Sequence, residues 1–237
     1  MTTWTRHLYE HDPLAIAKGE SNHLSVRNIS GYQENVTTSF IPAWEYATAY
    51  TYPTSAVTMD VASTDTVNDN GYTVRIIGLD ANYNIISEDV TIPATTTKAF
   101  FRINDVLYFN TDSNQGLITV SNGGTVYAAI RIGDGRNQAS IYTVPAGHCF
   151  YLYRIDAFSN DSSSSKTGVF KNFTINSSGH TFNVARTTFQ NQMNIQHRLP
   201  LKYDAKTDIQ FQVRTKSGTH EMNVYSEGVL VNEGLDD

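Results

Sequence analysis

The sequence predicts an all-β protein whose antiparallel strands form a β-sandwich or jelly-roll architecture. Its 237 residues include 28 Thr, 19 Ser and 20 Asn, together with 14 Tyr and 11 Phe. β-Branched and aromatic side chains favour strands, whereas Ser and Asn favour turns. Charged residues make up only 17% of the chain, below the roughly 25% of a typical soluble domain. This composition excludes a helical bundle, a coiled coil and a disordered tail.

Residues 1–20 are the only stretch with helical character. Trp4, Leu8 and His11 fall on one helical face, and Pro13 ends the pattern. We expect a short N-terminal arm that packs on its own body or on a neighbouring subunit. His7 and His11 could ligate a metal from one helix face, but no third ligand follows at a motif spacing, so no metal site is expected.

Short strands separated by turn residues are expected from residue 21 onward. In the segment 72–78, Tyr72, Val74 and Ile76 share one parity, and the segment follows a turn that ends at Gly71. By the same reasoning, we expect further strands at 85–92, 99–110, 116–120, 125–132, 139–144, 148–158, 168–175, 181–189, 192–199, 207–216 and 221–230.

About a dozen strands at this spacing predict two packed β domains. The turn at Asp134 and Gly135 suggests the boundary. The expected organisation is therefore an N-terminal arm at 1–20, a β-sandwich at 21–135 and a second, jelly-roll-like sandwich at 136–237.

Charge and cysteine content limit the classes of partner. The net charge of −6 argues against a nucleic-acid partner, because binding phosphates requires clustered Lys and Arg. A single cysteine, Cys149, cannot form an internal disulfide. No apolar run approaches the length of a membrane span, and the N-terminus lacks the apolar core of a secretory signal. We expect neither membrane contact nor secretion.

No catalytic motif stands out. His148 and Cys149 are neighbours in an expected strand, so their side chains should point to opposite faces. The acidic turn at 65–71 lacks the ligand spacing of a calcium loop, and neither a Gly-x-Ser-x-Gly motif nor a phosphate-binding loop is present. A pair of carboxylates for glycoside hydrolysis could come from distant strands and would leave no local motif, so this alternative stays open. We expect a protein without enzymatic activity and without catalytic, cofactor-binding or metal-binding residues.

Four aromatic residues form the one candidate site. Trp44, Tyr46, Tyr50 and Tyr52 share parity, so an extended segment would present all four on one face. Such a row could be the inner face of a sheet, a subunit interface or a platform that stacks on sugars.

Several stretches resemble a family of virion structural proteins of tailed bacteriophages, notably phages of cyanobacteria and other aquatic bacteria. The matching residues lie between about 20 and 215 and include the runs 50–56, 78–91, 95–97, 101–103, 135–138, 141–147, 199–202 and 206–209. The run Gly-Leu-Asp-Ala-Asn-Tyr-Asn that begins at Gly78 is the most distinctive of them.

The resemblance implies a place in the virion, in a protein made in the host cytoplasm. The expected function is that of a capsid decoration or cement protein that stabilises the particle through subunit contacts. The alternative is a tail- or fibre-associated protein that contacts host surface glycans. The implied partners are further copies of the chain, plausibly in a trimer, and the major capsid protein or other virion proteins. A low charged fraction suits such contacts, since few charges lose water when subunits meet.

Overall fold

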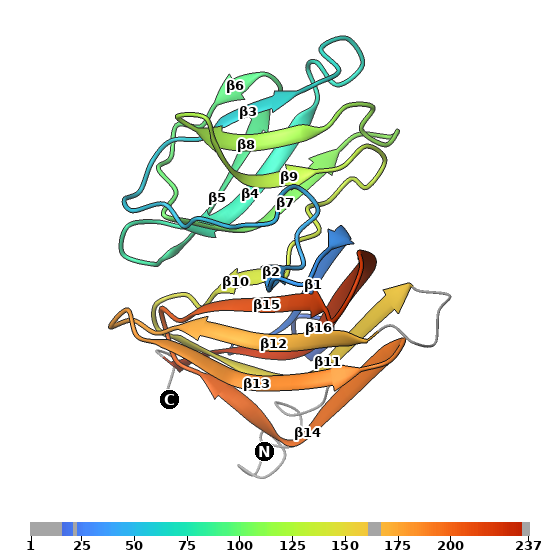
Figure 1. Ribbon diagram of the computed structural model, residues 1–237. Helices are drawn as coiled ribbons and strands as arrows, with labels where there is room; N and C mark the ends of the chain where they lie inside the picture. Colours follow the sequence, from blue (N-terminus) through green and yellow to red (C-terminus); the bar gives the residue numbers. More distant parts are fainter. Residues whose placement is uncertain (1–15, 21–22, 161–166, 234–237) are drawn as a thin grey trace.

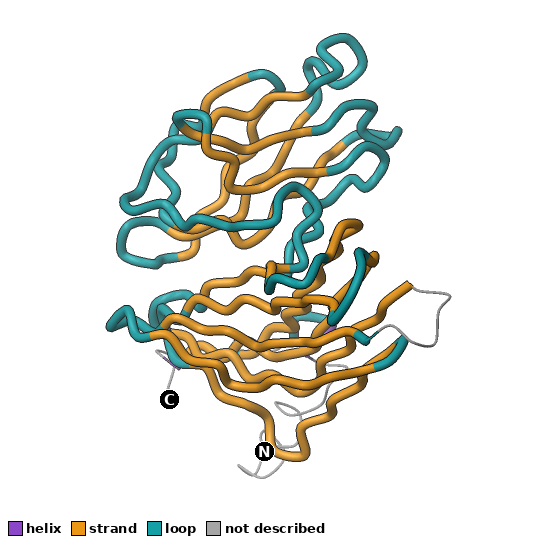
Figure 2. Tube along the Cα trace, viewed as in Figure 1, coloured by secondary structure: helices purple, strands orange, loops and turns teal. Residues whose placement is uncertain are grey.

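The computed structural model describes residues 16–20, 23–160 and 167–233 of the chain. Within these ranges sixteen strands form four sheets, and every strand pairing between them is antiparallel. The sheets combine into two sandwiches, which lie one above the other in Figure 1, and strand dominates the trace in Figure 2. The predicted all-β sandwich fold is confirmed. Among the described residues, no helix has the length and apolar character needed to cross a bilayer.

The lower sandwich combines the two ends of the described chain. One sheet, here called the β14 sheet, has the order β1-β16-β11-β14, and the other, the β13 sheet, has the order β10-β15-β12-β13 with β2 beside β15. The strands are β1 (Leu24–Val36), β2 (Ile41–Pro42), β10 (Ile141–Thr143), β11 (His148–Asn160), β12 (Gly168–Ile175), β13 (Thr181–Phe189), β14 (Gln192–Tyr203), β15 (Asp208–Thr215) and β16 (His220–Asn232).

The upper sandwich is formed by the middle of the chain. Its two sheets have the orders β6-β3-β8-β9 and β5-β4-β7. The strands are β3 (Asp60–Ser63), β4 (Thr73–Leu79), β5 (Ile85–Thr91), β6 (Ala94–Thr95), β7 (Arg102–Phe109), β8 (Ile118–Asn122) and β9 (Thr125–Ile130).

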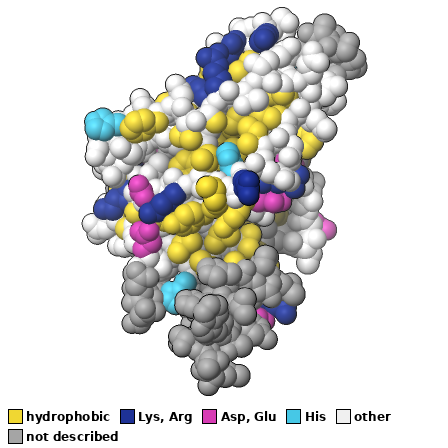
Figure 3. Space-filling model, turned by 90° about the horizontal axis from the view of Figure 1, so that it is seen from below, with side chains coloured by type: hydrophobic (Ala, Val, Ile, Leu, Met, Phe, Trp, Pro, Cys, Tyr) yellow, Lys and Arg dark blue, Asp and Glu magenta, His cyan; other side chains and the backbone are white. Residues whose placement is uncertain are grey.

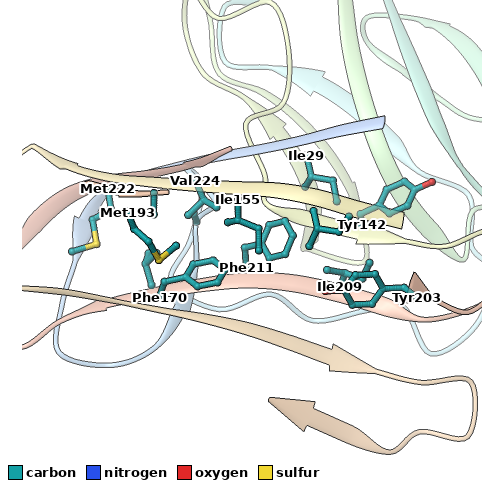
Figure 4. Close-up of a cluster of buried hydrophobic side chains, with 14 of the residues drawn as sticks. Ile29, Tyr142, Ile155, Phe170, Met193, Tyr203, Ile209, Phe211, Met222 and Val224 are labelled. Carbon is teal, nitrogen blue, oxygen red and sulfur yellow. The ribbon is translucent and has the colours of Figure 1, made fainter. Parts of the chain in front are cut away.

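Each sandwich has its own hydrophobic core. In the lower one, Phe150, Phe170 and Phe211 are fully buried between the sheets, and Figure 4 shows part of this cluster. In the upper one, Phe100 and Ile76 belong to a second, separate cluster. Full burial of such a side chain contributes roughly 1.5–3 kcal/mol. Two cores of this kind let each sandwich bury its own apolar faces.

All twelve strands expected from the sequence are present. The structure also contains β1 and β2, and their partners differ from the expected division of the chain into two sandwiches. Residues 24–42 were expected in the first sandwich, whereas β1 pairs with β16 and β2 with β15, in the lower sandwich. The segment Leu24–Val36 has no clear apolar alternation in its sequence, because Gly31 and Gln33 take the buried positions that follow Ile29. Residues 1–15 of the expected arm lie outside the described residues, and the jelly-roll topology of the second sandwich stays a prediction.

Candidate functional site

The four aromatic residues singled out in the sequence contact one another in a row. Ring centroids are 5.4 Å apart between Trp44 and Tyr46, 5.1 Å between Trp44 and Tyr50, and 5.0 Å between Tyr50 and Tyr52. The segment that carries them is an irregular connection between β2 and β3 rather than a strand. The rings therefore meet through bends in the backbone and not through the expected parity.

Their exposure differs along the row. Trp44 is 2% exposed, Tyr50 and Tyr52 are half-buried, and Tyr46 is 41% exposed. Burial raises the pKa of the Tyr50 and Tyr52 hydroxyls well above the ordinary value, so both stay protonated at neutral pH. Trp44 fits the core interpretation of this row, and the most accessible ring is Tyr46. An interface or sugar-binding role of the row stays a prediction.

The inner end of the row contacts a buried ion pair at the junction of the two sandwiches. Arg102, the first residue of β7, pairs with Asp208, the first residue of β15, through two hydrogen bonds of 2.9 and 3.1 Å. Their side chains are 9% and 7% exposed. The guanidinium lies 4.6 Å from the centroid of the Tyr52 ring, and Thr143 donates a 2.6 Å hydrogen bond to the Asp208 carboxylate. A buried charge pair of this kind requires such additional partners to offset its desolvation.

Further polar contacts join the sandwiches beside this pair. Asn104 in β7 exchanges two 2.9 Å hydrogen bonds with the backbone of Thr143 in β10. The backbone N–H of Ala146 donates to the carbonyl of Tyr83 at 2.9 Å. The junction is therefore polar and specific, in contrast to the two apolar cores.

A groove of about 870 Å³ lies between the two sandwiches, with lining residues from both. Glu45 lies in its wall, with a side chain only 7% exposed, near Asp134 and Arg131. Burial, followed by a hydrogen bond with Asp134 and the negative charge of that group, raises the pKa of Glu45 to about 8. The carboxyl is therefore protonated over much of the neutral range. The remaining lining residues include Tyr32, Leu117, Gln138, Phe158 and Tyr225.

The outer face of the β14 sheet carries a second groove, of about 820 Å³, with a mainly apolar lining. Val26 and Tyr153 on this face are 47% and 46% exposed, and Leu199 next to it is 82% exposed. Figure 3, which views the molecule from below, shows hydrophobic side chains gathered between charged ones. The lining is formed by Ile16, Leu24, Val26, Asn28, Tyr151, Tyr153, Pro200, Glu227, Gly228, Val229 and Val231.

Sequence reasoning missed this outer face. Tyr151 and Tyr153 share parity in a strand that was expected, and this was the available signal. The face is completed by Val26 of β1 and Val229 of β16, strands that lie about 200 residues apart in the chain but pair directly. Their pairing could not be predicted from the local pattern.

The other candidates for chemistry are placed as follows. Cys149 is buried, and burial raises the pKa of its thiol to about 11. The ring of His148 contacts the carbonyl oxygen of Ala146. Within the described parts of the chain, no group of three His, Cys, Asp or Glu residues is placed to hold a metal ion. His7 and His11 lie outside the described residues.

No protein-family model and no curated protein matches the chain. Among solved structures, it is similar to the infectious bursal disease virus Gx strain structure, with 9% identity, a TM-score of 0.27, and coverage of 91% of this chain and 73% of the other. It is also similar to the VP2 subviral particle of that virus, with 10% identity, a TM-score of 0.23, and coverage of 90% of this chain and 73% of the other. TM-scores this low establish neither a common fold nor a common function, so function is inferred below from the chain's own residues.

Asp208→Asn should destabilise the protein by about 3–5 kcal/mol, because it leaves the buried Arg102 guanidinium without its counter-charge. Chemical denaturation monitored by fluorescence measures this loss. The matched control is Asp89→Asn, which breaks the exposed ion pair with Arg75 and should cost less than about 1 kcal/mol. Equal losses in the two variants would contradict a structural role of the junction pair.

The stability of the protein should fall as pH rises from about 4.5 to 8, with Glu45 as one source. The folded chain holds the Glu45 proton at pH values where an unfolded Glu has lost it, so deprotonation favours unfolding. Glu45→Gln should remove this dependence. The free energy of unfolding of the variant, relative to that of the wild type, should be higher at pH 9 than at pH 6 by at least about 1 kcal/mol, since one pKa unit corresponds to about 1.4 kcal/mol. Urea denaturation at a series of pH values tests this. The exposed Glu20→Gln variant is the control, and an unchanged slope in Glu45→Gln would refute the assignment.

Proposed function

We propose that this chain is a non-enzymatic structural protein of a bacteriophage particle and that it decorates and stabilises the capsid through subunit contacts. The observation that carries the proposal is the apolar outer face of the β14 sheet. Exposed apolar residues are common when scattered singly, but a contiguous groove bounded by charged residues is typical of an interaction site. The resemblance between residues 20 and 215 and tailed-phage virion proteins supports the same role.

We assign this face to a second copy of the chain. Ile16, the first described residue, lines the groove, and it belongs to the arm expected at residues 1–20. Those residues include Trp4 and Leu8, the apolar positions of the arm expected from the sequence. An arm exchanged between copies would extend the buried area at each contact, and the high local concentration in an assembly offsets the cost of ordering it.

The charges around the groove are consistent with repeated subunit contact. Glu227 at its rim lies 3.8 Å from Arg154, and Lys202 near its other side pairs with Asp204 and Glu233. Because these charges are already paired, burial of the face leaves few single charges to desolvate. The centre of the face can therefore be covered at low electrostatic cost.

Val26→Asp should disrupt this contact, because it places a charge on the apolar face. In light scattering after gel filtration, we expect the wild type to be oligomeric and the variant to shift to monomer. Mass spectrometry and cryo-electron microscopy of particles from a host producing each form should find the wild type in many copies and little of the variant. Val67→Asp, at an 81% exposed position of the upper sandwich, is the matched control.

Two results would overturn this proposal. A wild-type chain that is monomeric and absent from purified particles would contradict the virion role. A Val26→Asp variant that keeps the wild-type mass and its place in the particle would contradict the assignment of the face.

The alternative is a tail- or fibre-associated protein that contacts host glycans, and the placement of Tyr46 favours it. This exposed ring lies beside Glu45 and Arg131, so an aromatic face and polar hydrogen-bonding groups occur together. Sugars are commonly bound by such combinations. If this alternative holds, Tyr46→Ala should abolish a signal on a glycan array while leaving the fold unchanged in circular dichroism. Binding that survives in Tyr46→Ala would exclude this surface, and the exposed Tyr72→Ala variant is the control.

A further inference from the structure

The outer face of the β13 sheet carries three cations that converge on one aromatic ring. The Lys171 Nζ atom lies 4.4 Å from the centroid of the Phe40 ring, and the guanidinium carbons of Arg186 and Arg214 each lie 5.1 Å from it. Lys171 also lies 5.2 Å from the ring of Phe173. The three cations come from adjacent strands, β12, β13 and β15.

This cluster lacks the counter-charges found at most other arginines. Among the described residues, Arg75, Arg102, Arg131, Arg136 and Arg154 all pair with carboxylates. No described carboxylate lies within ion-pair distance of Lys171, Arg186 or Arg214. Among the described residues, Arg214 donates hydrogen bonds to the backbone carbonyls of Thr38 and Thr215, both at 3.4 Å.

The arrangement costs stability in the isolated chain. Lys171 and Arg186 stand directly opposite each other in the β12–β13 register, and like charges in this position repel. Burial and the nearby Arg186 charge lower the pKa of Lys171. A protein of net charge −6 thus keeps an uncompensated positive cluster at one place on its surface.

β13, the strand that carries Arg186, also has an open backbone edge. β13 is the terminal strand of its sheet and pairs only with β12 among the described residues. Phe182 and Val184 on this strand are 51% and 43% exposed. Phe182 is opposite Thr174 in the register, on the face of β13 away from Arg186. An open strand edge is a template for a further strand.

We propose that β13 is the docking edge for an extended segment of a partner protein that carries carboxylates on one face and apolar side chains on the other. The segment adds a strand to β13, its carboxylates pair with Arg186 and its neighbouring cations, and its apolar side chains cover Phe182. Main-chain pairing supplies affinity and the alternate side chains supply selectivity in such contacts. Arg and carboxylate groups form the strongest of these pairs because they can share two hydrogen bonds.

The geometry favours an acidic polypeptide over other anions. Stacking on a sugar needs a free ring face, and cations already surround the ring of Phe40. Nucleic acid would meet the overall charge of −6. An acidic strand uses both the charge cluster and the open edge. This inference deepens the proposed structural role by naming the chemistry of one partner, but it can be tested on the purified chain.

The test uses the full chain and a fluorescent synthetic peptide that alternates Glu with Val. Fluorescence anisotropy should detect binding that weakens as salt is added. Arg186→Glu should weaken it by roughly tenfold or more, because it reverses the charge nearest the edge. The matched control is Arg198→Glu, an exposed arginine on β14 without a described carboxylate partner, which should leave the affinity unchanged. Circular dichroism confirms the fold of both variants.

Two further ligands separate the parts of the proposal. A peptide with Gln in place of Glu should lose binding, and an acidic peptide with N-methylated backbone amides should lose it too, because it cannot pair with the edge. The proposal is overturned if the acidic peptide does not bind, if Arg186→Glu and Arg198→Glu have the same effect, or if an acidic polysaccharide such as hyaluronate binds more tightly. Absence of the chain from phage particles would overturn the proposed function and leave the peptide result intact.

Discussion

Arg102 and Asp208 join two sandwiches that otherwise have separate hydrophobic cores. Each residue begins a strand, and their mutual hydrogen bonds tie β7 of the upper sandwich to β15 of the lower. Thr143, Tyr52 and nearby backbone carbonyls supply the partners that a buried pair needs. The relative placement of the sandwiches, and hence the groove between them, depends on this polar junction. Apolar burial stabilises each half, whereas directional hydrogen bonds determine how the halves meet.

The positions of the strands could be predicted from the sequence much better than the pairing and contacts of residues far apart in the chain. Alternation and turn residues predicted twelve strands, because both signals lie within a few residues of one another. The partner of β1 could not be predicted, since Leu24 pairs with Val231 across nearly the whole chain. The aromatic row was identified by its residues but not by its geometry: Trp44 to Tyr52 contact one another through an irregular connection that no periodicity describes. The buried Arg102–Asp208 pair had no local signal at all.

The scarcity of charge in the sequence acquires a more specific meaning in the structure. Most of the described arginines pair with carboxylates within the chain, at the junction or at the rims of surface grooves. The surface is therefore divided by chemistry. The outer face of the β14 sheet is apolar, and Glu227 and Lys202 beside it are paired with opposite charges, whereas the β13 edge combines an open strand with three cations that lack a described carboxylate partner. Two such surfaces on opposite sheets of one sandwich suit a subunit with two different kinds of neighbour.

The chain order also bears on how the molecule is made. The chain leaves the lower sandwich after β2, builds the whole upper sandwich from β3 to β9, and then returns for β10 to β16. During synthesis the upper sandwich has all its strands once β9 has emerged. β1 must wait for β16, the only described strand with which it pairs, and β16 is translated last among the strands. We expect the ribosome-bound intermediate to hold a folded upper half and an unpaired first strand, so late truncation should leave the N-terminal strand prone to aggregation.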